Sequence, residues 1–256
     1  RRGASMTGFL VLLCVLVLVL INVPIAVALC IASVIAMVTT QGVASLPNVS
    51  MALYQGATSF PLIAIPLFIL AAAIMNTSGI SHRLIDFCQA LVGWMRGALA
   101  QVNVLSHMFF AEISGSAVAG VAATASIIIP AMKERGYPGP FSAAVTSSTA
   151  TLAIILPPSI PMILYAVMAG TSVVQMFVAG IVPGLLAGFG MMSLCYWYAL
   201  KYNWPVEEIF QWGKLWRAFK PAFWALTLPV VILGGIFGGI VTATEGAALA
   251  VLAALL

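Results

Sequence analysis

Residues 101–132, QVNVLSHMFFAEISGSAVAGVAATASIIIPAM, decide the fold of this chain together with residues 141–170, FSAAVTSSTATLAIILPPSIPMILYAVMAG. Each stretch is apolar enough for a membrane helix, yet each is interrupted, the first at residues 114–116 and the second between residues 146 and 159. Lipid cannot satisfy the backbone N–H and C=O groups that such a break exposes, so each break is expected in a protein interior or beside a cavity. Paired broken segments point to the substrate and ion site of a secondary transporter.

The composition allows only a membrane protein. Hydrophobic residues make up 63% of the chain and charged residues 6%, and the mean hydropathy is +1.16. Soluble domains carry about 25% charged residues. The net charge of +4 comes from basic residues scattered over short loops, so it does not indicate nucleic-acid binding. The four cysteines stand singly in apolar surroundings, and we interpret them as buried free thiols without a metal.

The hydropathy pattern predicts an all-α polytopic membrane protein. Residues 6–39 are interrupted at Asn22-Val23-Pro24 and are too long for a bilayer core of about 30 Å. They are predicted to be one kinked, tilted span or a span plus a half-helix. Residues 40–59 are predicted to be a polar loop without charges. Further spans are expected at residues 60–76, 175–200 and 221–239, broken apolar elements at 98–132 and 140–170, and another helix beginning at 243.

Two segments between the spans are predicted to be amphipathic, residues 77–97 and 201–220. The second holds Trp204, Trp212 and Trp216 beside basic residues, which is typical of an interfacial helix that lies along the membrane.

The basic residues predict the orientation, because cytoplasmic loops carry the excess of Lys and Arg. All ten of them fall on the cytoplasmic side under three conditions. The N-terminus must be cytoplasmic, residues 6–39 must cross once, and residues 98–132 must form a re-entrant hairpin. The charge-free loops 40–59 and 171–174 then lie outside, and the hairpin tip lies at membrane depth.

Ser and Thr hydroxyls and freed backbone carbonyls are hard oxygen ligands, which suit Na⁺ without a carboxylate. The N-terminus of the returning helix, at residues 116–118, would favour an anionic substrate group. A single Ser or Thr in a membrane helix usually only bonds to the carbonyl four residues earlier. Two clusters, each at a break, favour a site. The predicted substrate and Na⁺ residues are Ser114, Gly115, Ser116, Thr146, Ser147, Ser148, Thr149, Pro157, Pro158 and Ser159, with Na⁺ held through Ser114, Ser116 and Thr149.

Three further polar residues carry separate interpretations. Glu112 lies two residues before the hairpin tip, and it is either a coupling carboxylate or a solvated group in a water-filled cavity. His107 is interpreted as a packed helix residue. Glu245 follows Thr242 by three residues, the spacing of a capping box, so we interpret it first as part of a helix start.

These residues resemble the large membrane subunit of tripartite ATP-independent periplasmic (TRAP) transporters. The most specific stretches are SGSAVA at 114–119 and PPSIPMILY at 157–165, and NVPIAVAL at 22–29 and GGIVTATEGAALAV at 238–251 fit in order. The resemblance implies an elevator-type transporter with two opposed hairpins and Na⁺ sites, and not an enzyme. By position, residues 114–116 match the cytoplasmic-side hairpin tip, and residues 146–149 and 157–159 match the broken helix behind it.

The resemblance also implies the physiology. A permease of this family resides in the bacterial inner membrane and takes up organic acids such as C4-dicarboxylates, keto acids or sialic acids with Na⁺ and without an organic cofactor. A periplasmic binding protein delivers the substrate, and a small four-helix membrane subunit is a partner. The sequence departs from the family pattern at three places. Gly120 stands where many relatives have Asp, Ala153-Ile154 stands where relatives often have Gly-Pro, and Glu112 replaces a residue that is usually small.

The expected organisation follows from the same resemblance. Residues 1–97 are predicted to hold scaffold-type helices and an amphipathic arm, and 98–200 one half of the transport domain. Residues 201–239 are predicted to form a second arm and a connecting span. Residues 240–256 are predicted to begin a second inverted repeat that is truncated, so we expect a fragment.

Other classes of protein remain as alternatives. An ion channel can also use broken helices, but it would be expected to show a repeated filter or a pore-lining ring. An intramembrane enzyme would need an embedded nucleophile–base pair or metal ligands. A membrane scaffold would not need broken helices. We therefore expect a transporter, with an ion channel or a membrane scaffold protein as the alternative.

Overall fold

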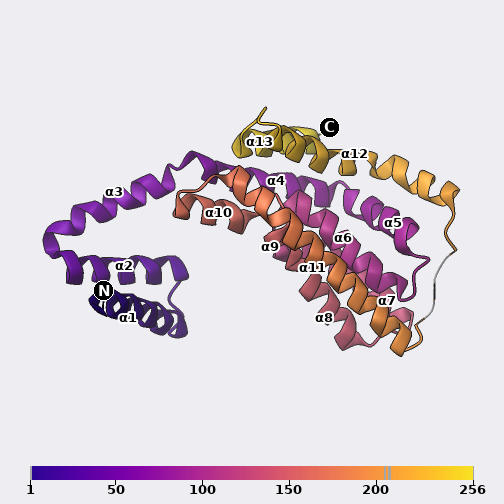
Figure 1. Ribbon diagram of the computed structural model, residues 1–256, viewed down its shortest axis with the longest axis horizontal. Coiled ribbons are helices and arrows are strands. Elements are labelled where there is room, and N and C mark those ends of the chain that lie inside the picture. Colours follow the sequence, from indigo (N-terminus) through magenta and orange to yellow (C-terminus); the bar gives the residue numbers. More distant parts are fainter. Residues whose placement is uncertain (1, 205, 207–208, 256) are drawn as a thin grey trace. The chain divides into compact units, whose positions relative to one another are not determined.

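The computed structural model describes residues 2–204, 206 and 209–255, and the side chains of all of these except 2–7, 76, 113, 114 and 123. The described residues form helices joined by short connections, which confirms the all-α prediction (Figure 1). The chain divides into two units, Arg1–Ser59 and Phe60–Leu256, and each is described by itself.

The first unit begins with two helices where one kinked span was predicted. Helix α1 (Arg2–Leu20) and helix α2 (Ile25–Gln41) pack against each other. Asn22 takes a left-handed conformation, with φ of 67°, and Pro24 precedes α2 without an N–H to donate. A left-handed residue and a proline end a helix outright rather than bend it. The option of one crossing by residues 6–39 is therefore wrong.

The predicted polar loop at residues 40–59 is also wrong, because most of it is helical. A short 3-10 helix, η1 (Val43–Ser45), leads into helix α3 (Leu46–Ala57). Pro47 lies in the first turn of α3, where its missing N–H costs no hydrogen bond. The absence of charged residues in this stretch was therefore not a sign of a loop.

The second unit is built around one central helix, α6 (Ala98–Ser114), which packs against α4, α5, α7, α8, α9, α11 and α12. Gln101 on α6 is fully buried and donates from Nε2 to the Met192 carbonyl on α11, at 2.9 Å. The other elements are η2 (Phe60–Ile63), α4 (Ala64–Thr77), α5 (Ile80–Val92), α7 (Ala117–Glu134), α8 (Gly139–Ala150), α9 (Leu152–Ile155), α10 (Ile160–Ala169), α11 (Val173–Lys201), α12 (Trp212–Phe237) and α13 (Ala243–Leu255).

Three helical segments of the described chain are long and apolar enough to cross a membrane. The first is Gly139–Ala169, which comprises α8, α9 and α10. The other two are α11 and α12. The predicted broken element at 140–170 and the predicted spans at 175–200 and 221–239 correspond to these three segments.

Several connecting segments of the second unit lie together at one end. A Cβ atom on Gly97, before α6, would lie 2.6 Å from Cβ of Ala199 near the end of α11. The ring of Tyr137, between α7 and α8, lies 4.5 Å from the ring of Trp204. Burial raises the pKa of Tyr137 to about 12, so this phenol stays neutral. We name as the basic end the segments 93–97, 133–138, 201–204 and 209–217.

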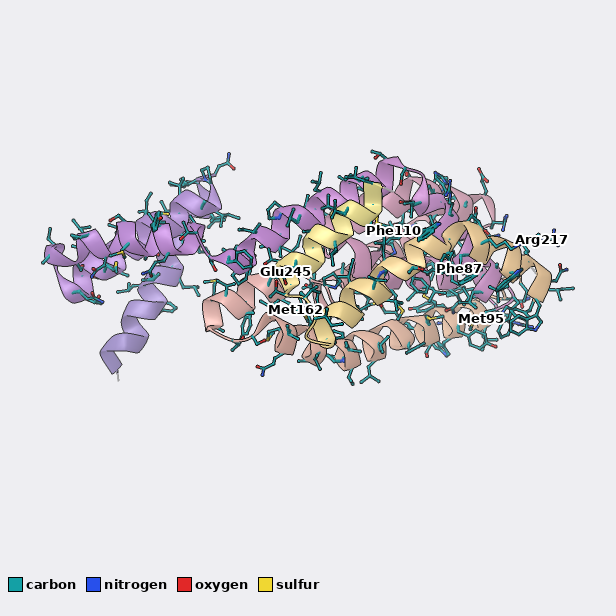
Figure 2. All side chains as sticks on the ribbon, turned by 90° about the horizontal axis from the view of Figure 1, so that it is seen from above. Phe87, Met95, Phe110, Met162, Arg217 and Glu245 are labelled. Carbon is teal, nitrogen blue, oxygen red and sulfur yellow. The ribbon has the colours of Figure 1, made fainter. Side chains whose placement is uncertain are left out.

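Figure 2 shows Met95 and Arg217 toward the same end of the second unit. Helix α6 starts and helix α7 ends at the basic end. A re-entrant hairpin formed by residues 98–132 requires this arrangement, because both of its ends must lie on the same side of the membrane. Which side of the membrane this end faces stays a prediction.

The predicted separate amphipathic helix at 201–220 is wrong. Helix α12 begins at Trp212 and continues through Pro221 into the span. Trp212 and Trp216 are exposed, as interfacial anchors would be, whereas Trp204 is buried against Tyr137. Tertiary packing of the aromatic rings therefore removes Trp204 from the predicted set of anchors.

Helix α11 carries a glycine stripe that brings the broken segment close. Gly180, Gly184 and Gly188 recur every four residues, so they share one face. A Cβ atom on Gly180 would clash with the Ile155 carbonyl at the end of α9, and one on Gly184 would lie 2.6 Å from the Leu156 side chain. The stripe therefore positions the residues just before the break.

Candidate functional site

The two breaks predicted from the sequence meet in the structure. The N–H of Ile160, at the start of α10, donates to the carbonyl of Gly115 at the hairpin tip, at 3.3 Å. Gly115 has a left-handed φ of 56°, and a Cβ atom there would lie 2.5 Å from the Pro158 carbonyl oxygen. Only glycine fits such a backbone approach without strain. The structure therefore brings Gly115, Pro158 and Ser159 together.

The second break is narrower than predicted. Helix α8 continues to Ala150, a turn at Thr151 leads into α9, and only residues 156–159 are non-helical, with a cis bond between Pro157 and Pro158. The hydroxyl-rich residues 146–149 lie inside α8, so the prediction of a break from residue 146 is wrong. The physical reason is that Ser and Thr can bond to their own helix, whereas consecutive prolines cannot continue one.

The four hydroxyl residues of α8 divide between two faces. Thr146 and Thr149 are buried and donate to the Ser142 and Val145 carbonyls, each at 2.8 Å. The side chains of Ser147 and Ser148 are exposed. Because successive helix residues point about 100° apart, four consecutive residues cannot converge on one point. Thr146 and Thr149 alone of this group contact the side chains of α6.

Ser159 is the N-cap residue of α10 and is fully buried. Its hydroxyl donates to the Ile154 carbonyl at 2.7 Å, so it satisfies one of the carbonyls left open where α9 ends. Ser159 thus lies at the predicted site and helps to hold the break in shape.

The hairpin tip is partly capped by its own serine. Ser116 precedes α7, and its hydroxyl accepts a hydrogen bond from the Ala119 N–H, at 3.4 Å. This cap engages the Ala119 N–H, one residue beyond the N–H groups of 116–118 that were predicted to favour an anion. The side chain of Ser114 lies outside the described residues. Val118, beside the tip, is exposed.

A buried polar cluster lies in the same part of the unit. His107 on α6 has Nε2 3.0 Å from Oγ1 of Thr124 on α7, and Nδ1 3.2 Å from Oγ1 of Thr149 on α8. Nδ1 also lies 2.9 Å from the Asn103 carbonyl, and Asn103 Nδ2 donates to Oγ1 of Thr146 at 2.7 Å. These five side chains, which we name the His107 cluster, connect both arms of the hairpin to α8.

The hydrogen-bond partners favour one arrangement of protons on a neutral His107 ring. One ring nitrogen donates and the other accepts. The Asn103 carbonyl can only accept, so a proton on Nδ1 points to it and leaves Nε2 as the acceptor. The Thr124 hydroxyl then has two acceptors for its one proton, Nε2 at 3.0 Å and the Gly120 carbonyl at 2.9 Å. The interpretation of His107 as a packed residue is right in its burial but misses this bridging role. The four-residue spacing of Asn103 and His107 on one helix face was a usable signal.

The two singled-out carboxylates differ in their surroundings. Glu112 is half-buried one turn before the tip, and its role stays a prediction. Glu245 completes the predicted capping box of α13, because its Oε2 accepts from the N–H and hydroxyl of Thr242 at 2.7 and 2.9 Å, and its own N–H donates to that hydroxyl. The interpretation of Glu245 as part of a helix start is confirmed.

Within the described residues no group of three His, Cys, Asp or Glu side chains could hold a metal ion. The four cysteines are free, as predicted. Cys88 and Cys195 are buried, but Cys14 is half-buried and Cys30 is exposed, so the expectation of burial fails for these two. An apolar residue on a membrane protein can face lipid, and hydropathy does not distinguish lipid from protein.

An all-α chain with membrane-spanning helices and a hairpin tip lodged against a proline-broken helix belongs to the class of polytopic membrane transporters. Residues 12–256 match the family described as "Tripartite ATP-independent periplasmic transporter, DctM component". The chain belongs to this family.

Named relatives support the family assignment. The chain is 45% identical to the C4-dicarboxylate TRAP transporter large permease protein DctM of Vibrio cholerae, over 81% of this chain and 46% of the relative. It is 43% identical to the isethionate TRAP transporter permease protein DctMQ of Oleidesulfovibrio alaskensis, over 84% and 34%. It is 42% identical to the 2,3-diketo-L-gulonate TRAP transporter large permease protein YiaN of Escherichia coli, over 79% and 48%. The chain therefore spans at most about half the length of these relatives.

Proposed function

We propose that this chain forms part of the substrate and ion pathway of a Na⁺-coupled permease that imports an organic acid. The observation that carries the proposal is the hydrogen bond from the Ile160 N–H to the Gly115 carbonyl, which places one helix break against the other. Broken backbone at membrane depth is tolerated where it lines a cavity or is buried in protein. Transporters use such breaks to hold substrates and coupling ions.

The coupling ion in this proposal is Na⁺, bound by oxygen atoms near the tip. The Gly115 and Pro158 carbonyls and the Ser114 and Ser116 hydroxyls are hard ligands of the kind that Na⁺ takes. Thr149 was also predicted as a ligand. Its hydroxyl donates to the Val145 carbonyl and lies beside His107, so we assign it to holding the hairpin rather than the ion.

The substrate in this proposal is an anion. The relatives named above are C4-dicarboxylate, isethionate and 2,3-diketo-L-gulonate transporters, all of them for acidic compounds. The N-terminus of α7 begins at the tip, and helix N-termini favour negative charge. We expect a dicarboxylate, a keto acid or a sialic acid, delivered by a periplasmic binding protein to a permease that also contains a small four-helix subunit.

We further propose that the permease resides in the bacterial inner membrane with the basic end facing the cytoplasm. The prediction of a cytoplasmic N-terminus rested on a single crossing by residues 6–39. The two helices α1 and α2 remove that premise, so the orientation proposal rests on the second unit alone.

The test is uptake of labelled succinate, pyruvate and sialic acid into liposomes that contain the complete transporter and its binding protein. Uptake of at least one acid should follow an inward Na⁺ gradient without ATP. Transport of a labelled amine but of no acid would contradict the proposal. An ion channel would instead pass current that does not saturate with the acid and does not need the binding protein.

A further inference from the structure

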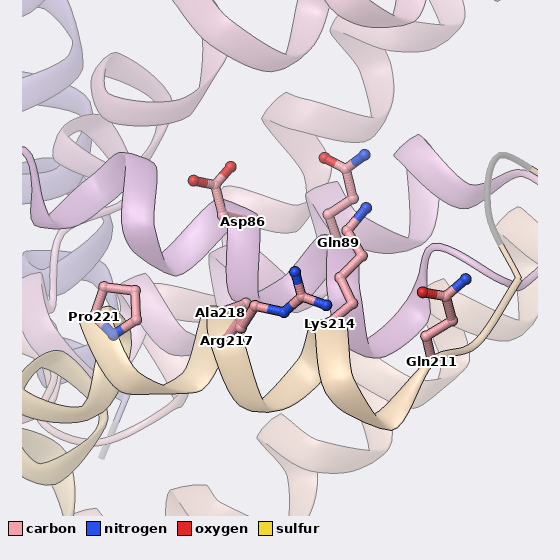
Figure 3. Close-up of a pocket in the computed structure, with 7 residues that line it drawn as sticks. All are labelled: Asp86, Gln89, Gln211, Lys214, Arg217, Ala218 and Pro221. Carbon is pink, nitrogen blue, oxygen red and sulfur yellow. The ribbon is translucent and has the colours of Figure 1, made fainter.

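A pocket of about 480 Å³ lies between α5 and the first turns of α12, and its lining shares no residue with the hairpin tip (Figure 3). Asp86 and Gln89 contribute from α5, and Lys214 and Arg217 contribute from α12. Each pair is three residues apart, so each shares a helix face. Figure 3 shows the side chain of Lys214 extending from α12 toward Gln89 on α5, and that of Arg217 running along α12 toward Lys214. The pocket thus presents two cations and one carboxylate.

Aromatic packing holds the two walls of the pocket together. The rings of Phe87 on α5 and Phe219 on α12 lie 6.0 Å apart, and Phe87 also packs against Phe109 on α6. The pocket is therefore anchored to the central helix of the unit, and its charged groups stand on a packed base.

The charged groups of the pocket come from two helices, Asp86 from α5 and Lys214 and Arg217 from α12. The Arg217 Nε donates to the Gly213 carbonyl at 3.2 Å, which orients the guanidinium group. Among the described residues no ion pair joins Arg217 to Asp86, although both line the pocket. A ligand that carries both an anionic and a cationic group would pair with each of them.

The pocket lies at the level expected for lipid headgroups. Helix α12 is a membrane-spanning candidate, and the pocket uses its first turns. Trp212 and Trp216, on the same turns, are 76% and 61% exposed. Exposed tryptophans at the end of a span mark the interface between lipid and water. A molecule that reaches this pocket from the membrane therefore offers its headgroup first.

We propose that this pocket binds the headgroup of phosphatidylethanolamine. The phosphate pairs with Arg217 and Lys214, which are donors suited to phosphate oxygens, and the ammonium group pairs with Asp86. The volume falls in the range of about 300–1,000 Å³ that small-ligand sites occupy. Phosphatidylglycerol offers the same phosphate but no ammonium group, so it would leave Asp86 unpaired beside a negative lipid.

The experiment uses the complete transporter, purified in detergent and depleted of lipid. Bound lipid is counted by native mass spectrometry during titration with phosphatidylethanolamine or phosphatidylglycerol, and inorganic phosphate serves as a headgroup-free probe. We expect phosphatidylethanolamine to bind more tightly than phosphatidylglycerol. R217Q should weaken its binding about tenfold, the loss expected for one charge-assisted hydrogen bond. D86N should abolish the preference between the two lipids.

Lys220→Gln is the matched control, because Lys220 lies on the same helix and does not line the pocket. It should leave lipid binding unchanged. Equal binding of the two lipids by the unsubstituted protein, an R217Q variant that binds normally, or competition by phosphate that removes the lipid at equal concentration would each overturn the proposal. The readout is lipid binding, so it does not depend on transport of an organic acid.

Discussion

Thr124 Oγ1 lies 3.0 Å from His107 Nε2, and the two residues belong to opposite arms of the re-entrant hairpin. We expect this bond to hold the arms together. Thr124→Val should lower the free energy of unfolding by about 1–3 kcal/mol, because it leaves the buried His107 Nε2 without its partner. His107→Phe should lower it by a similar amount, because it removes the hydrogen bonds that the ring makes to Thr124 and Thr149. A double-mutant cycle on the purified transporter, followed by thermal unfolding, should show a coupling of about 0.5 kcal/mol or more.

Thr151→Val is the control for this cycle. Thr151 is the C-cap residue of α8, and its exposed hydroxyl donates to the Ser148 carbonyl of that helix, at 2.6 Å. It should unfold like the unsubstituted protein. Strictly additive effects of the His107 and Thr124 substitutions would show that the bond does not form.

Gly115→Ala should abolish uptake. The substitution places a methyl group against the Pro158 carbonyl and forces a left-handed conformation, which costs about 1–2 kcal/mol for a non-glycine residue before any clash. Gly120→Ala on the same hairpin is the comparison, since its methyl group would meet His107 at an ordinary 3.5 Å. Uptake into liposomes at equal protein content should fall strongly for the first and little for the second. Equal activity of the two variants would argue against close packing of the hairpin tip on the Pro158 carbonyl.

Gly180→Ala on α11 should push α11 away from the end of α9 and so disturb the broken helix. Its methyl group would meet the Ile155 carbonyl, which is backbone and cannot rotate away. The same change at Gly190, ten residues along α11, meets nothing within 4 Å. We expect the Gly180 variant to unfold several degrees lower in a thermal scan and the Gly190 variant to be unchanged. A Gly180 variant of normal stability would mean that α9 lies further from α11.

The orientation of the basic end can be tested by labelling. In a background without the four native cysteines, Thr171→Cys should react with a membrane-impermeant thiol reagent from the periplasm. Glu134→Cys should react only after the membrane is opened. Both positions are exposed, so access to the reagent is limited by the bilayer. Labelling of residue 134 from the periplasm would reverse the proposed orientation.

The sequence predicted the elements that depend on local chemistry. The hairpin tip at residues 114–116 follows from a glycine between serines in an apolar helix, and the capping box at Thr242 and Glu245 is a four-residue pattern. The break at residues 156–159 was placed correctly only at its proline end. Ser147 and Ser148 are as small and polar as the residues of a true break, but both lie inside α8, where the Ser147 hydroxyl donates to the Ala144 carbonyl.

The errors arise where tertiary packing decides. Trp204 has the sequence neighbours of an interfacial anchor, but its burial depends on Tyr137, 67 positions earlier in the chain. The bonds of the His107 cluster likewise join α6 to α7 and α8, and no local pattern specifies which threonine meets the imidazole. Residues Leu46–Ala57 form helix α3 although they lack the charges that usually mark an amphipathic helix.

Glu112→Gln should separate the two interpretations of this carboxylate. Glu112 lies half-buried one turn before the tip, and a negative charge there would attract Na⁺ and repel an anionic substrate. If it takes part in coupling, the variant should need a higher Na⁺ concentration for half-maximal uptake, with expression and thermal stability unchanged. Glu134→Gln removes the same charge from an exposed position at the basic end and should leave the Na⁺ dependence as it was. If both variants reach half-maximal uptake at the same Na⁺ concentration, Glu112 is only a solvated group. Coupling then resides in the uncharged oxygen atoms of the tip.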